Sequence, residues 1–60
     1  MDLNDRVILA TAIENELWRL EQYAKAEEAA DRAGSARLDR EQAEELRNCA
    51  VRLGIFKEIY

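Results

Sequence analysis

Histidine and proline are absent from this 60-residue chain, which also has only one cysteine, two glycines and four aromatic side chains. The lack of histidine excludes histidine-based acid–base catalysis and histidine ligation of metals. One cysteine cannot form a disulfide within the chain, a pattern typical of proteins from a reducing compartment. Because proline is missing, no residue of that kind interrupts a long helix. These absences favour a helical protein with little chemistry of its own.

The few residues that carry reactive groups do not form a site. Cys49 lies in an apolar stripe, where we interpret it as a small core residue; a redox contact between two copies is the alternative. Glu14 and Glu21 are two helical turns apart, about 10 Å, which is too far to hold one metal ion within a helix. We interpret them as interface-edge residues that fix register or pair with Arg47 or Arg52. The chain is therefore predicted to have no catalytic, cofactor or metal site and not to be an enzyme.

Length, hydropathy and charge bound the class of protein. Sixty residues make a single domain, residues 1–60, with few large apolar side chains for a core. The longest apolar-rich run, VILATAI, is far shorter than the ~20 residues that cross a bilayer, and no signal peptide is visible. A net charge of −4 argues against a general binder of nucleic-acid phosphates. We expect a soluble, cytoplasmic protein that depends on a partner surface.

A first helix is predicted from about residue 4 to residue 33. Asp2 or Asn4 can accept the free amide hydrogens of its first turn. No residue then breaks the helix before Gly34, where a glycine in the left-handed conformation can end it. The preceding segment, AKAEEAADRA, has no apolar side chain larger than alanine. It either packs closely against the second helix or packs loosely.

A second helix is predicted from about residue 39 to residue 59. Asp39 is a good cap, and Gln42 follows three residues later, as in a capping box. A loop of about five residues before it favours antiparallel packing, so the predicted fold class is an all-α, antiparallel αα-hairpin. An apolar stripe continues through Gly54, and we expect the helix to continue there too, at a cost of about 1 kcal/mol. That stripe consists of Leu46, Cys49, Leu53, Phe56 and Tyr60.

Each helix carries more apolar side chains than one hairpin needs. The main stripes are expected to form the hairpin core, with Leu17, Leu20, Leu53 and Phe56 buried. A second stripe on each helix has no role inside a single hairpin, so we predict that it makes a homodimer, a four-helix bundle anchored by Trp18. The alternative is that this second stripe binds a foreign partner. The predicted interface residues are Val7, Thr11, Trp18, Val51, Ile55 and Ile59.

The function most consistent with these features is that of a non-enzymatic protein-interaction module. Small, acidic proteins without catalytic residues are common among the regulators, inhibitors and adaptors of phages, plasmids and bacteria. We therefore expect a homodimeric regulator or inhibitor that binds a larger protein, with no cofactor, no membrane and no nucleic acid as partner. An alternative is an acidic surface that mimics nucleic-acid phosphates, formed by Glu41, Glu44 and Glu45.

The stretch LDREQA, residues 38–43, together with the chain length, resembles the Rop-type plasmid copy-number regulators. Those proteins are dimers of helical hairpins that bind paired RNA loops. The resemblance covers about a tenth of the chain and lies in capping residues, not in residues that contact RNA. It implies a four-helix-bundle RNA-binding regulator as an alternative function. The candidate basic residues for such binding, Arg6, Arg19, Lys25 and Arg32, do not align in one stripe.

Overall fold

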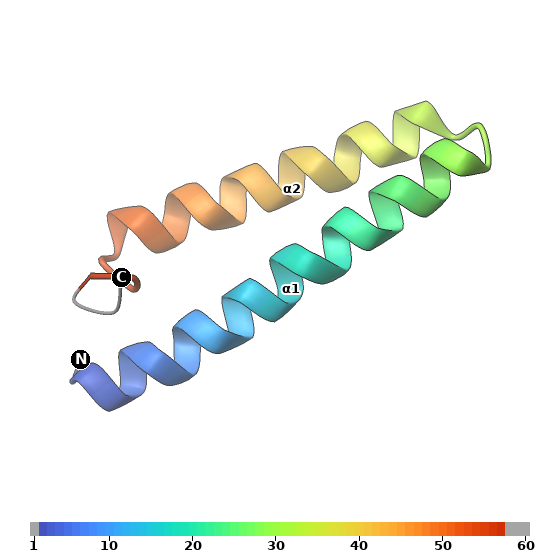
Figure 1. The fold of residues 1–60 in the computed structure, drawn as a ribbon. Helices are drawn as coiled ribbons and strands as arrows, with labels where there is room; N and C mark the ends of the chain where they lie inside the picture. The colour runs from blue at the N-terminus through green and yellow to red at the C-terminus, as the bar shows by residue number, and fades with distance from the viewer. Residues whose placement is uncertain (1, 58–60) are drawn as a thin grey trace.

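The computed structural model describes residues 2–57, which form two α-helices. Helix α1 spans Leu3–Ala29 and helix α2 spans Ala33–Arg52. The helices run antiparallel, side by side, along a body of 43 × 16 × 15 Å, with the start of α1 and the end of α2 at the same end (Figure 1). The predicted all-α helical hairpin is confirmed. The turn between the helices and the end of α2 differ from prediction.

Helix α1 begins where the sequence places a cap. The side chain of Asp2 accepts a hydrogen bond from the backbone N–H of Asp5 at 2.8 Å, which satisfies one of the free amide groups of the first turn. Of the two alternatives for the cap, Asp2 and Asn4, the structure selects Asp2. Asp5 itself lies in the first turn, where a negative charge is favourable to the helix dipole.

Helix α1 ends at Ala29, earlier than predicted, because an aspartate and not a glycine takes the left-handed conformation. Asp31 has φ 61°, and its N–H donates to the carbonyl of Glu28 at 3.1 Å. The N–H of Arg32 donates to the carbonyl of Glu27 at 2.7 Å, which completes a Schellman motif. Aspartate visits this conformation more readily than most side chains do. The predicted helix end at residue 33 and the five-residue loop were therefore wrong.

Helix α2 starts at Ala33, so the predicted start at Asp39 is also wrong. Arg32 precedes it and makes no side-chain capping hydrogen bond. Asp39 lies half-buried inside α2, and the LDREQA stretch is interior to the helix, so its residues cap nothing. The early start brings Ala36 into α2, where it is 1% exposed, while Ala24 of α1 is 0% exposed. Burial of these small side chains in the seam favours the short turn over the capped start.

Helix α2 ends at Arg52, and Gly54 terminates it, in contrast to the predicted continuation to residue 59. Gly54 has φ 70° and donates its N–H to the carbonyl of Val51 at 3.1 Å. The N–H of Ile55 donates to the carbonyl of Ala50 at 3.0 Å, which forms a second Schellman motif. Ile55 then packs in one cluster with Ala50. The apolar residues after Gly54 therefore pack on the hairpin through a turn that folds back, and not through a continuous helix.

Alanines fill the seam between the helices. On α2 they recur at every seventh residue, a spacing that keeps them on one side of the helix. Small side chains at a contact allow two helices to approach closely, so the loop end of the hairpin is closely packed. Large apolar side chains are rare in this core. The buried side chains among the described residues are Ala10, Leu20, Ala24, Ala36, Ala43, Ala50 and Ile55.

The predicted leucine core is only partly realised. Leu20 is buried, as predicted, whereas Leu17 and Phe56 are half-buried. Leu53 is 68% exposed, so its assignment to the core was wrong. It follows the last turn of α2 at a point where the chain leaves the seam, and Ile55 takes the buried position at that end instead.

Candidate protein interface

Large apolar side chains lie outside the alanine seam, on two sides of the hairpin. Helical spacing places the members of each set on one side of their helix. We call one side the tryptophan face, and it comprises Val7, Thr11, Trp18 and Val51, all exposed. We call the other side the leucine face, and its exposed members are Leu9, Tyr23, Leu38 and Leu53.

The tryptophan face holds four of the six predicted interface residues. Trp18 is 67% exposed, and Val51 on α2 is exposed to a similar degree. The hydroxyl of Thr11 donates to the carbonyl of Val7 at 2.9 Å within α1, so this face presents little unsatisfied polar character. A shallow groove continues the face between the helices. It is lined by Glu14, Leu17, Arg47, Val51 and Phe56.

The other two predicted interface residues do not lie on this surface. Ile55 is 2% exposed and belongs to the core cluster with Ala10 and Ala50. Its assignment to an outward face was wrong, because that assignment assumed a continuous helix and the turn at Gly54 folds Ile55 back into the hairpin. Ile59 lies outside the described residues.

Ion pairs join the helices on the side of the tryptophan face, towards the loop. The Nη2 atom of Arg40 lies 2.6 Å from Oε1 of Glu28 and 3.5 Å from Oε1 of Glu21. The hydrogen bond from Arg40 lowers the pKa of Glu28 below its ordinary range. Glu21 therefore pairs with Arg40, where the sequence had suggested Arg47 or Arg52. On this side, the seam near the loop is therefore flanked by charged side chains.

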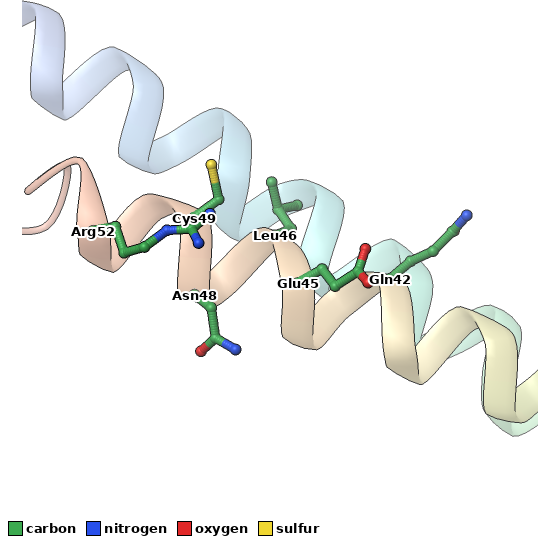
Figure 2. Close-up of a pocket in the computed structure, with 6 residues that line it drawn as sticks. All are labelled: Gln42, Glu45, Leu46, Asn48, Cys49 and Arg52. Carbon is green, nitrogen blue, oxygen red and sulfur yellow. The ribbon is translucent and has the colours of Figure 1, made fainter.

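No ion pair crosses the seam on the leucine face within residues 2–57. Leu38 is 58% exposed there, while Leu46 and Cys49 are half-buried. Figure 2 shows Leu46 and Cys49 projecting to one side of α2 and Asn48 to the opposite side. A groove runs along the outer surface of α2, between these two sides (Figure 2). The residues that line it are Gln42, Glu45, Leu46, Asn48, Cys49 and Arg52 (Figure 2).

A bonded arginine and an aromatic ring occupy the α1 part of the leucine face. Arg19 donates to both carboxylate oxygens of Glu16, at 2.5 and 2.9 Å, and its guanidinium carbon lies 5.3 Å from the centre of the Tyr23 ring. The hydrogen bond from Arg19 lowers the pKa of Glu16. This cluster ties three side chains of α1 together and neutralises the Glu16 charge.

Two carboxyl groups meet across the seam near the loop. The neighbouring Asp39 carboxyl raises the pKa of Glu27, and burial adds to that rise, while Arg32 and Ser35 oppose it. One oxygen of each carboxyl, Oε2 of Glu27 and Oδ2 of Asp39, is out of contact with solvent. Glu27 and Asp39 are therefore two acids that oppose each other across the seam near the loop.

Sequence reasoning missed the leucine face because it placed the leucines inside the hairpin. The signal that would have revealed it is the alanine at every seventh position of α2: Ala36, Ala43 and Ala50. Such a row permits a closer helix approach than a leucine row does, and the helix contact then follows the alanines. Larger side chains next to the row are left at its edges, exposed to solvent.

The described part of the chain brings no group of three or more aspartate, glutamate or cysteine side chains together as metal ligands. Neither of its helices has an apolar stretch long enough to cross a membrane. No protein-family model matches the chain, and no curated protein or solved structure is significantly similar to it. The exposed apolar faces are therefore the features on which a functional proposal rests.

Proposed function

We propose that this chain is a small, non-enzymatic protein-interaction module: a homodimeric regulator or inhibitor that acts by binding a larger protein. The observation that carries the proposal is the placement of large and small apolar side chains. The alanines of the seam are buried, whereas Trp18, Leu38 and Leu53 are more than half exposed. Burial of a large apolar side chain stabilises by about 1.5–3 kcal/mol, and exposed apolar patches mark protein interfaces.

The total surface area supports the same proposal. The accessible surface of the chain is 4546 Å², whereas a compact monomer of 6.9 kDa exposes about 4000 Å². The excess arises because two helices cannot shield both sides of their own seam. A partner that covers one face removes this excess, and a stable interface takes about 800 Å² from each partner.

The tryptophan face is the surface that we propose for the larger protein. It lies towards the open end of the hairpin and carries Trp18, a residue type enriched at the energetic centres of interfaces. Our sequence-based prediction gave this face to the homodimer because the leucines were expected inside the hairpin. Since Leu53 and Leu38 lie outside, a separate apolar face supports assembly, and Trp18 is free for a foreign protein.

The substitution Trp18→Ala tests this proposal. Mass spectrometry would first identify proteins that the tagged chain retains from its native host, and one purified partner would then be titrated. We expect Trp18→Ala to weaken binding by about thirtyfold or more, because a central aromatic anchor contributes at least about 2 kcal/mol. The variant should keep wild-type helicity and mass in solution, because Trp18 is outside the hairpin core.

The matched control is Leu38→Ala, which removes a similarly exposed side chain from the opposite face. Its titration with the purified partner is performed above the concentration at which light scattering reports full assembly. We expect partner binding to stay within about twofold of wild type, since rim and remote substitutions change affinity little. Equal losses for both variants, or unchanged binding of Trp18→Ala, would exclude the tryptophan face.

RNA binding has less support among the described residues. Arg19, Arg37 and Arg40 each pair with a carboxylate of the same chain. The LDREQA stretch lies inside α2, so its likeness to a capped helix start has no structural counterpart. We therefore propose protein binding and not RNA binding.

A further inference from the structure

We infer that a second copy of this chain covers the leucine face, related by a two-fold axis at the middle of the hairpin, so that the two loops lie at opposite ends of a four-helix bundle. This inference deepens the homodimer of the proposed function, on which it rests, by assigning its face and its symmetry. It is independent of what binds the tryptophan face.

The two helices are in a register that defines the middle of the face. Ala10 and Ala50 belong to one core cluster near the open end, and Glu21 pairs with Arg40 nearer the loop. Residues 15 and 16 are midway between the two α1 residues, so they lie about level with residue 45 of α2, which is midway between Ala50 and Arg40. Both helices therefore share one central level on the leucine face.

The large side chains of the leucine face are arranged symmetrically about this level. On α1, Leu9 and Tyr23 are each seven residues from Glu16. On α2, Leu38 and Leu53 are equally far from the midpoint between residues 45 and 46. A two-fold interface requires such a pattern, because each residue must meet a counterpart that meets it in return. A foreign partner imposes no symmetry of this kind, so the pattern favours a second copy.

The charges at the two ends of α2 select the orientation of that copy. Arg52 makes no ion pair within the described residues, and Asp39, on the other side of the midpoint, adjoins Glu27. With loops at opposite ends, Arg52 of the second copy reaches the level of Asp39, and this happens twice in the dimer. With loops at the same end, the Glu27 and Asp39 carboxyls of one copy would lie level with those of the other copy. Repulsion among these carboxylates disfavours that arrangement.

Two charged residues, Glu16 and Glu45, lie on the central level. Glu45 is two residues from the buried Ala43, about 200° around α2, so it projects away from α1 and does not face the axis. Glu16 approaches its own copy near the axis. Arg19 of the same chain donates to both of its oxygens, so each Glu16 carries its own counter-charge. The axis region therefore joins two neutralised pairs.

This register makes one direct contact that can be tested by disulfide formation. Gln42 and Cys49 are equally far from the midpoint of α2 and line the same groove (Figure 2). Gln42 of one copy should therefore face Cys49 of the other. Two Cys49 residues should be about 10 Å apart along the axis, beyond the Cα separation of up to about 6.8 Å that a disulfide allows.

The experiment mixes the variant Q42C/C49A with the wild-type chain under diamide. We expect a covalent dimer that contains one chain of each kind, resolved by mass spectrometry. Neither the wild-type chain alone nor Q42C/C49A alone should form more than a trace of covalent dimer. Each of these controls has a single cysteine, so no disulfide within a chain complicates the result.

A charge exchange gives a second measurement that does not depend on disulfide geometry. Arg52→Glu should weaken the dimer by about tenfold or more, because it places a further acid at the level of each Asp39. The reciprocal change D39R in the same chain, R52E/D39R, should recover most of that loss. Recovery is not expected if Arg52 contributes only to the end of α2.

Light scattering of the wild-type chain separates the possible failures. A dimer that gives no mixed disulfide and no recovery by charge exchange would overturn the inferred face and leave the proposed function standing. A concentration-independent monomer would overturn both the inference and the homodimer in the proposed function. A mixed disulfide together with recovery is the expected result.

Discussion

Arg40 is the residue that joins the two helices by charge, since it reaches both Glu28 and Glu21 from α2. Its bond to Glu28 lowers the pKa of that carboxyl, so the pair stabilises the folded chain above the ordinary pKa range of glutamate. The stabilisation is lost as the pH falls through the lowered pKa, where Glu28 becomes protonated in the folded state as well. Salt also weakens it, because all three side chains are partly exposed.

Arg40→Gln should therefore lower the melting temperature at neutral pH, and its difference from wild type should shrink as the pH drops below the ordinary pKa of glutamate. Thermal unfolding at fixed protein concentration across a pH series measures this difference. The control is Arg37→Gln, because the Arg37–Glu41 pair is long, at 3.9 Å, and lies within one helix. Equal shifts for both variants at neutral pH would mean that the bridge between the helices adds nothing.

At the scale of the helices, the two glycines have opposite roles. Gly54 has φ 70° and ends α2, whereas Gly34 lies inside the first turn of α2 with ordinary helical geometry. A Cβ atom added at either position meets nothing within 4 Å, so backbone conformation alone decides the effect. Gly54→Ala should destabilise by about 1–2 kcal/mol. Gly34→Ala should stabilise by up to about 1 kcal/mol. Urea unfolding of the two variants checks the signs, and a gain for Gly54→Ala would indicate a helix that continues.

The existence, direction and pairing of the helices and the start of α1 could be predicted from the sequence, but the other three helix ends could not. Long apolar periodicity without proline is sufficient for two helices and a reversal. The position of the reversal depends on a left-handed residue, and a sequence rule favours glycine there, so it points to Gly34 and not to Asp31. Asp39 looks like a cap in isolation, yet burial of Ala36 in the seam outweighs a single capping interaction.

At the scale of the whole molecule, the alanine seam decides which side chains remain for partners. Trp18 and Val51 could be identified as surface residues from the sequence because they fall outside every main stripe. Ile55 and the leucine face could not, because their exposure depends on which row of each helix faces the other. A row of alanines and a row of leucines have the same heptad spacing, and only tertiary packing chooses between them.

The seam itself can be tested by enlarging one of its residues. Ala43 is buried against α1, so Ala43→Leu should force the helices apart and destabilise by about 1–3 kcal/mol. Ala29→Leu, at the exposed end of α1, is the control and should change stability little. Urea unfolding at one fixed protein concentration is the measurement, since assembly contributes to apparent stability.

A second consequence distinguishes separation of the helices from local crowding. If Ala43→Leu moves α2 away from α1, the bond between Arg40 and Glu28 should break, because it spans the two helices at 2.6 Å. Arg40→Gln should then lower the free energy of unfolding less in the Ala43→Leu chain than in the wild type. A double-mutant cycle measures this coupling. Full additivity of the two substitutions would mean that the leucine is absorbed without moving the helices. In that case the alanine row would not set their separation, and the exposure of the leucine face would need another cause.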